Sequence, residues 1–310
     1  MPGDQMHVFL PIAQASAAIP VLVAIGGLVG LVSGLFGVGG GFLLTPLLMF
    51  IGISPMVAAA SDSAQIVASS TAGTLAHSRA GTVDYKMGVI LFVGGAVGSA
   101  FGVRLLEWLN RFGPANSVIR VLYVVLLGSV GAFMLFESVR TLRRGAYMSE
   151  RRFQPIKHRS WIDRLPFRVV FPKSGIEVSL LMPLAMGLLG GLLAALMGVG
   201  GGFIMVPLML YVLGMRMHVV AGTSLFQILF TCMLVTVLQA AENFTVDFVL
   251  AFMLAIGSTA GAIVGARLGR RLRADQLKIL LAVLVLLVAM KVTLDLVLPP
   301  DVLLSHLAGH

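Results

Sequence analysis

The stretch GLFGVGGGFLLTPLL, from Gly34 to Leu48, interrupts an apolar run with the four glycines of a GVGGG motif and with Pro46. A near copy, ALMGVGGGFIMVPLM, spans Ala195 to Met209. Each interior glycine costs a helix about 1 kcal/mol relative to alanine, so each motif disfavours a continuous helix by about 4 kcal/mol. We therefore expect a helix to break at each GVGGG motif.

The composition is that of an integral membrane protein. Of 310 residues, 58% are hydrophobic and 11% are charged, and the mean hydropathy is +1.00. A soluble domain has about 25% charged residues. Continuous apolar stretches fill nearly the whole chain except Thr141 to Glu177, which predicts an all-α polytopic membrane protein. The single cysteine, Cys232, leaves no disulfide and no cluster of metal-ligand spacing, so we predict neither metal nor cofactor.

The chain contains an internal duplication. GVGGGF at 37–42 matches GVGGGF at 198–203 with an offset of 161, and Val83-Asp84 matches Val246-Asp247 with an offset of 163. We expect a first transmembrane repeat over 1–140, a basic linker over 141–177 and a second repeat over 178–310. Each repeat should contain five helical segments, at 19–36, 42–53, 56–77, 84–108 and 116–139, and at 178–197, 203–214, 217–240, 246–268 and 276–298.

Charge predicts the orientation of the segments. Ten Lys and Arg residues lie between Arg140 and Lys173, and a second basic cluster runs from Arg267 to Lys278. The positive-inside rule places both in the cytoplasm and both termini outside, in a multi-pass protein of the plasma (inner) membrane. The two halves then begin on opposite faces, which is the inverted-topology repeat typical of secondary transporters. The basic linker should face lipid headgroups rather than nucleic acid.

The segment after each break is too short to cross the bilayer. Phe42 to Ile53 covers about 18 Å, against a hydrocarbon core of about 30 Å, so it is either a re-entrant hairpin or part of a discontinuous helix. Its unpaired backbone must line a protein-enclosed or watery cavity. The free N–H groups and the positive dipole end at such a helix start attract an anion.

We call the two GVGGG segments, 37–41 and 198–202, the tips. In an inverted repeat the two tips should meet near the midplane of the membrane and form one binding site. The substrate contacts predicted from the motifs are Gly39, Gly40, Gly41, Thr45, Gly200, Gly201 and Gly202.

The third segment of each half adds a row of neutral polar residues. Ser61, Gln65 and Ser69 recur at four-residue spacing, and Thr223, Gln227 and Thr231 repeat the pattern. Neutral hydrogen-bond donors suit an oxyanion that must be bound and then released. Hydrogen bonding between helices is the alternative. We count Ser61, Ser63, Gln65, Thr223, Ser224 and Gln227 among the predicted substrate contacts.

Two titratable residues lie in the same segment. Asp62 is either a proton relay or the cap of a helix that begins nearby. His77 is either a proton shuttle or an interfacial residue that reaches toward water. Asp84 and Asp247 are predicted to cap the helices that start beside them. Glycines at four-residue spacing are predicted to allow close helix packing, at Gly26, Gly30, Gly34, Gly94, Gly98 and Gly102.

With these residues in view, the chain resembles the TauE/SafE family of sulfite and organosulfonate exporters. The resemblance lies in the doubled G-x-G-G-G-F element at Gly37 to Pro46 and Gly198 to Pro207, in the HSRAGTVDYKMG loop at 77–88, and in Gly98 to Arg104. It implies export of a small sulfur-containing anion such as sulfite, thiosulfate or an organosulfonate. The family often has a Thr-Ser pair in both halves, whereas here the first pair is Asp62-Ser63.

We therefore expect a secondary anion transporter that works by alternating access. A passive anion channel and a non-transporting membrane subunit remain the alternatives, and a homodimer is left open. No nucleophile, metal or paired-carboxylate arrangement of an intramembrane enzyme is found in the sequence, so catalytic residues are predicted to be absent.

Overall fold

The computed structural model describes residues 7–13, 15–113, 115–143, 167–272 and 274–297, most of which are helical. In chain order the elements are β1 (His7–Leu10), β2 (Ala15–Ala18), α1 (Ile19–Phe36), α2 (Gly41–Phe50), α3 (Pro55–Arg79), α4 (Tyr85–Arg111), α5 (Ala115–Arg143), β3 (Arg168–Phe171), β4 (Ile176–Ser179), α6 (Leu181–Met197), α7 (Gly202–Pro207), the π-helix η3 (Leu208–Val212), α8 (Met217–Leu238), the π-helix η4 (Gln239–Asn243), α9 (Phe248–Gly269) and α10 (Ala274–Val297).

The prediction of an all-α polytopic membrane protein is confirmed, apart from two short β-hairpins. Among the described residues, five helices are long and apolar enough to cross a membrane: α1, α4, α5, α9, and α8 together with η4. Shorter apolar helices accompany them, including α2, α6 and the continuous helical segment Gly202–Val212.

Both helix breaks at the GVGGG motifs are confirmed. α1 ends at Phe36, and Gly37 follows in the left-handed region with φ 75°. Gly40, with φ 83°, immediately precedes α2. The second copy repeats this geometry, since α6 ends before Gly198 at φ 73° and Gly201 at φ 72° precedes α7. Residues with a Cβ rarely adopt this backbone conformation, so these positions require glycine.

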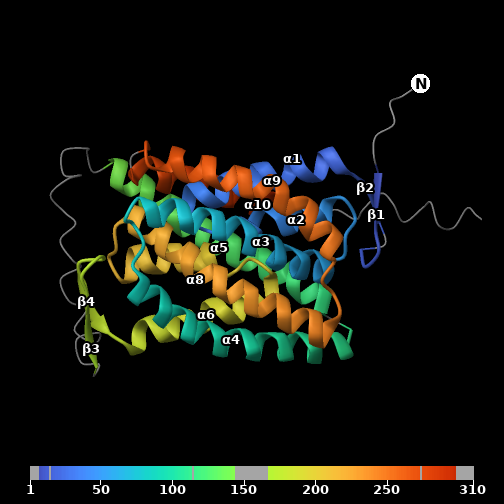
Figure 1. Cartoon of the computed structure of the whole chain (residues 1–310), viewed down its shortest axis with the longest axis horizontal. Helices are drawn as coiled ribbons and strands as arrows, with labels where there is room; N and C mark the ends of the chain where they lie inside the picture. The colour runs from blue at the N-terminus through green and yellow to red at the C-terminus, as the bar shows by residue number, and fades with distance from the viewer. Residues whose placement is uncertain (1–6, 14, 114, 144–166, 273, 298–310) are drawn as a thin grey trace, which may run out of the picture.

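The close-packed helix pairs each combine one helix from either half. α1 packs along α9, and α4 packs along α6 (Figure 1). A Cβ on Gly34 would lie 2.0 Å from the carbonyl oxygen of Ala262, and a Cβ on Gly98 would lie 2.0 Å from that of Leu188. The predicted packing role of these glycine rows is confirmed, because only a bare Cα allows backbones to approach this closely.

The centre of the bundle is formed by α3 and α8, which contact each other (Figure 1). α3 also packs on α9, and α8 packs on α4. α8 is the counterpart of α3 in the second half, and α9 is the counterpart of α4. The α3–α9 and α8–α4 contacts are therefore equivalent. α5 and α10 pack together as a further pair.

Two β-hairpins, which the sequence analysis missed, lie at opposite ends of the bundle (Figure 1). β1 pairs with β2 just before α1, and β3 pairs with β4 just before α6. β3 and the first two residues of β4 fall inside the segment that was predicted to be a linker, 141–177. The two hairpins are separated by the same 161 residues as the GVGGG motifs, and the matching pentapeptides HVFLP (7–11) and RVVFP (168–172) were the available signal.

Each hairpin is held by the aspartate that caps a helix of the opposite half. Asp84 Oδ1 accepts a hydrogen bond from the N–H of Met87 at 3.1 Å, while Oδ2 accepts from the N–H and hydroxyl of Ser174 at 3.2 and 2.5 Å. Asp247 caps α9 in the same way and accepts two N–H groups from the turn between β1 and β2. The predicted caps are confirmed, and both carboxylates also anchor a hairpin.

Replacing Asp84 with alanine should loosen the β3–β4 hairpin selectively. The variant loses a helix cap and two hydrogen bonds to Ser174, so we expect a loss of about 2 kcal/mol in unfolding free energy. Hydrogen exchange should accelerate over residues 168–179 and stay unchanged over the β1–β2 hairpin. Asp247→Ala, the matched variant, should give the reverse pattern. Unchanged protection of 168–179 in Asp84→Ala would contradict this anchoring role.

Candidate functional site

The two GVGGG tips meet inside the bundle. A Cβ on Gly41 would lie 2.7 Å from the Cα of Val199, and a Cβ on Gly202 would lie 2.1 Å from the carbonyl oxygen of Val38. All residues of both motifs are buried. The helical segments that begin at Gly41 and Gly202 therefore start beside one another.

Both tips present unsatisfied main-chain donors. The carbonyl of Gly40 accepts from the N–H groups of Leu43 and Leu44, as the carbonyl of Gly201 does from the corresponding residues of α7. Among the described residues, the N–H groups of Gly41 and Gly202 have no hydrogen-bond partner. Buried N–H groups without partners are rare in proteins and are the usual binding element for an anion at a helix start.

The middle of the contact between the tips is apolar. A Cβ on Gly39 would lie 3.2 Å from Cγ2 of Ile228 and 3.5 Å from Cγ2 of Ile66. Gly200 has the same two isoleucines as neighbours, together with Cys232. Ile66 and Ile228 therefore fill the space that both tips face, and Cys232 is a buried part of this cluster.

Ser63 and Ser224 hold the two breaks. The hydroxyl of Ser224 donates to the carbonyl of Gly37 at 2.5 Å, and the hydroxyl of Ser63 lies 3.5 Å from the carbonyl of Gly198. Each serine is fully buried. Both predicted site residues thus lie beside the GVGGG motif of the opposite half, next to the carbonyl of its first glycine.

Thr45 and Asp62 lie together at the start of α2. The hydroxyl of Thr45 donates to Asp62 Oδ2 at 2.7 Å, and both residues are fully buried. Ser54, not Asp62, occupies the N-cap of α3, so the interpretation of Asp62 as a helix cap is wrong. The helix starts earlier than a cap at Asp62 would need, because Pro55 is well suited to the first helical turn.

Tyr123 is a member of this cluster that the sequence analysis missed. Its hydroxyl donates to the carbonyl of Met197 at 2.7 Å and lies 3.5 Å from the carbonyl of Gly41, so it bridges the two tips. It is fully buried in α5. The only available signal was a single hydroxyl in the apolar run VLYVVLLG, which by itself does not distinguish a buried residue from an interfacial one.

Gln65 and Gln227 are buried amides with unused hydrogen-bonding capacity. Neither polar atom of the Gln65 side chain has a partner among the described residues, and the Oε1 atom of Gln227 has none either. Nε2 of Gln227 donates to the hydroxyl of Thr231 at 2.8 Å. Leaving such groups unpaired is costly, so these two positions suit a polar ligand or bound water.

Ser61 and Thr223 are engaged elsewhere. The hydroxyl of Ser61 accepts from the N–H of Asp247 at 2.9 Å, and that of Thr223 accepts from the N–H of Asp84 at the same distance. They therefore fasten α3 to the start of α9 and α8 to the start of α4. These two contacts are the hydrogen bonds between helices that we considered as the alternative.

His77 lies far from Asp62 along α3. The 15 intervening steps correspond to about 22 Å. Its Nε2 is 3.3 Å from the carbonyl of Gly34 and its Nδ1 is 3.1 Å from the hydroxyl of Thr82. The imidazole is buried at 3% exposure, so the interpretation of an interfacial side chain reaching into water is wrong.

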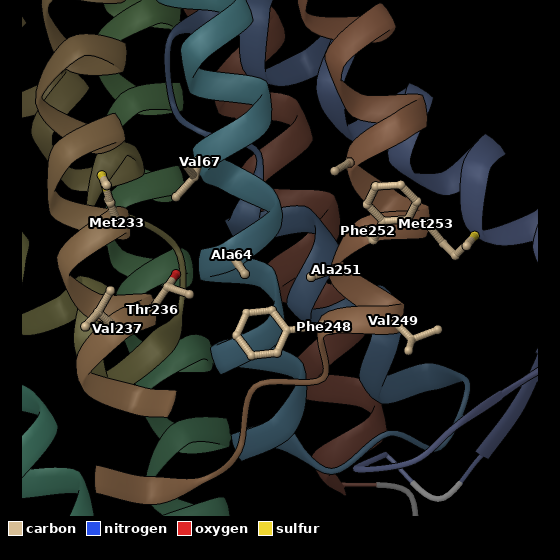
Figure 2. A pocket seen from close by; sticks show the side chains of 11 residues that line it. Ala64, Val67, Met233, Thr236, Val237, Phe248, Val249, Ala251, Phe252 and Met253 are labelled. Carbon is tan, nitrogen blue, oxygen red and sulfur yellow. The ribbon is translucent and has the colours of Figure 1, made fainter. Parts of the chain in front are cut away.

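An apolar cavity lies away from the tips, and no residue of either GVGGG motif lines it. It has a volume of about 700 Å³ and lies between α3, α8 and α9, and it is lined by Ala64, Val67, Met233, Thr236, Val237, Phe248, Val249, Ala251, Phe252, Met253 and Ala255. Figure 2 shows apolar side chains around it, with the hydroxyl of Thr236 as the only polar group among the labelled ones. Phe248 and Phe252 are each 62% exposed on the outer surface. This apolar cavity suits a lipid acyl chain and does not suit a small anion.

Comparison with known proteins identifies relatives over most of the chain. The chain is 29% identical over 221 residues to the probable membrane transporter protein YunE of Bacillus subtilis, covering 69% of this chain and 75% of that protein. It is 27% identical over 229 residues to a probable membrane transporter protein of Xylella fastidiosa, covering 73% and 76% of the two chains. No solved structure matches this chain.

Relatives that match over a shorter stretch of the chain carry a more specific name. The chain is 32% identical over 120 residues to sulfite exporter TauE/SafE family protein 2 of Arabidopsis thaliana, a match that covers 36% of this chain and 26% of that protein. The model of the family described as "Sulfite exporter TauE/SafE" matches residues 22–292, which include both GVGGG breaks and the helices between them. This multi-pass membrane protein therefore belongs to the TauE/SafE sulfite exporter family of membrane transporters.

Proposed function

We propose that this protein is a secondary transporter that exports a small sulfur-containing anion, such as sulfite, thiosulfate or an organosulfonate, across the plasma membrane. One observation carries the proposal. Two helical segments begin side by side in the interior, at Gly41 and Gly202, with N–H groups that have no partner among the described residues. Neutral main-chain donors at helix starts bind an oxyanion without a fixed cation, so the anion can also be released.

The anion would be bound by the tips and the polar groups around them. The buried side chains that we assign to this site are the hydroxyls of Thr45, Ser63 and Ser224, which would exchange their present partners for the anion, and the amides of Gln65 and Gln227. Oxyanions accept hydrogen bonds from hydroxyl, amide N–H and main-chain N–H groups alike.

Movement of the anion would follow an alternating-access cycle. In the present arrangement Gly41 and Val199 are in direct backbone contact, so an anion does not fit between them. Movement of the two tips apart, toward one end and then the other, would expose each tip in turn. The β1–β2 and β3–β4 hairpins lie at these two ends, and we place the β3–β4 end, which adjoins the basic segment, in the cytoplasm.

The assignment of a sulfur oxyanion is supported by the names of the Arabidopsis relatives and by the chemistry of the tips. A thermal-shift panel of sulfite, thiosulfate, sulfate, taurine, sulfoacetate, acetate and chloride should single out one or two ligands. A ligand present at a hundred times its dissociation constant stabilises the folded state by about 2.7 kcal/mol.

In proteoliposomes that contain the purified protein, the selected anion should accumulate against its concentration gradient when a membrane potential or a proton gradient is imposed. Equilibration without accumulation would contradict secondary transport and favour a passive channel. Absence of flux for every anion of the panel would favour a non-transporting subunit. Empty vesicles are the control for leakage, since small weak acids cross lipid in their neutral form.

A further inference from the structure

The carboxyl group of Asp62 lies against the first turn of α2. A Cβ on Gly41, the first residue of that helix, would be 2.8 Å from Asp62 Oδ2. Oδ2 accepts a hydrogen bond from Thr45, one turn further along α2. Oδ1 is buried and has no partner among the described residues. A carboxylate therefore occupies the place where the proposed substrate anion would approach α2.

Within the part of the chain that the structure describes, Asp62 has no ion-pair partner. The helices α1, α2 and α6, which pack around the start of α3, carry no titratable residue. The nearby titratable groups are Tyr123 of α5, whose hydroxyl lies beside Gly41, and Cys232 of α8, which lies beside Gly200, and both are neutral when protonated. Asp247 at the start of α9 touches neighbouring Ser61 through its N–H, and its carboxylate is turned to the β1–β2 turn.

The start of α2 is the main group that favours a negative charge at Asp62. A helix N-terminus carries a partial positive charge of about half a unit, which can stabilise one anion but not two. Two negative charges at this distance in a low-dielectric interior repel each other strongly. Either the Asp62 carboxylate or the substrate anion can occupy the α2 tip, but both cannot do so together.

We propose that Asp62 takes up one proton, on Oδ1, when an anion binds at the α2 tip, and releases it when the anion leaves. This inference rests on the proposed function and adds its coupling: one proton moves with each anion, in the same direction. The corresponding stretch of the second half has Thr223 and Ser224 and no acid, so the stoichiometry is a single proton. The Asp62 carboxylate therefore competes with the substrate anion for the start of α2, and protonation of the carboxylate ends this competition.

The test is the pH dependence of anion binding in the wild-type protein and in Asp62→Asn. Asparagine keeps the size of the side chain and an oxygen that can accept from Thr45, and it imitates the neutral carboxyl. The probes are thiosulfate and methanesulfonate, whose charges stay constant between about pH 5.5 and about pH 8. Glu177→Gln, which neutralises an exposed acid on β4, is the matched control.

For the wild-type protein and the Glu177→Gln control, the association constant should fall as the pH rises. Above the pKa of Asp62 in the anion-free protein, its logarithm should fall by about one per pH unit, which is the slope for one linked proton. For Asp62→Asn the constant should change by less than about twofold over the same range. Addition of thiosulfate to wild-type protein in weakly buffered detergent solution should consume one proton per bound anion, and Asp62→Asn should consume none. The same slope in Asp62→Asn, or no proton uptake by the wild-type protein, would overturn the role of Asp62.

These outcomes separate the two proposals. If wild-type protein binds the anions equally well across the pH range, the proton coupling is wrong and anion transport stands. If it binds neither probe at any pH, the anion function itself fails. Binding that requires sodium at constant pH, with choline as the replacement cation, would also overturn the proton coupling, because the carboxyl would then serve a metal cation.

Discussion

Alanine in place of Gly39 should reduce transport of the selected anion by about tenfold or more, with the protein still folded. Gly39 has φ +87°, and its Cβ would project between the two tips, 3.2 Å from Cγ2 of Ile228. A methyl group there narrows the space that both tips share and keeps an anion away from the main-chain donors. A tenfold loss corresponds to only about 1.4 kcal/mol, well within the effect of one displaced hydrogen bond to an anion.

Gly52→Ala is a closely matched control for this experiment. Gly52 has φ +90°, so alanine suffers the same backbone strain of about 1 to 2 kcal/mol, but nothing lies within 4 Å of its Cβ. Both variants should lose a similar amount of thermal stability, and only Gly39→Ala should lose uptake in proteoliposomes and the anion-induced thermal shift. Equal transport by the two variants would show that the tips do not bind the substrate.

Alanine in place of Gly30 should destabilise the protein by about 3 kcal/mol or more, which is the upper range for an overpacked contact. Its Cβ would lie 2.1 Å from the carbonyl oxygen and 2.5 Å from the Cα of Ser258, so α1 and α9 would have to move apart along their whole contact. Backbone atoms of a packed helix cannot yield as a flexible side chain does.

The control lies on the same helix, three residues earlier. A Cβ on Gly27 would be 3.7 Å from the carbonyl oxygen of Gly257, which is an ordinary contact. Gly27→Ala should therefore be neutral or slightly stabilising, because alanine favours helix by about 1 kcal/mol relative to glycine. Unfolding in detergent, followed by circular dichroism, measures both. Equal stability of the two variants would mean that α1 and α9 do not pack as closely as the structure indicates.

Features that depend on consecutive residues were predictable. The helix breaks at GVGGG follow from the conformational freedom of glycine, and the caps at Asp84 and Asp247 follow from the position of an acid just before an apolar run. The packing role of the glycine rows also follows from spacing. In each case the cause lies within about two helical turns of the residue concerned.

Features that depend on distant segments were missed or left open. Tyr123 joins the site because α5 brings its hydroxyl to the carbonyl of Met197, 74 residues away in sequence. Asp62 looked like a possible cap, but it lies against α2, because the short helix folds back onto α3. The hairpins escaped notice because four-residue strands have too few positions to establish an alternating pattern.

By itself, the sequence determined that the chain crosses a membrane repeatedly, that it is duplicated, and that two of its helices break at glycine. These properties follow from hydropathy and local backbone preference, which adjacent residues settle among themselves. Only the tertiary structure decided that the breaks face each other, that Ser61 and Thr223 fasten helix ends, and that Asp62 shares the start of α2 with the proposed substrate site. Those relations depend on which helices pack together, and such packing is a property of surfaces that come from residues far apart in the chain.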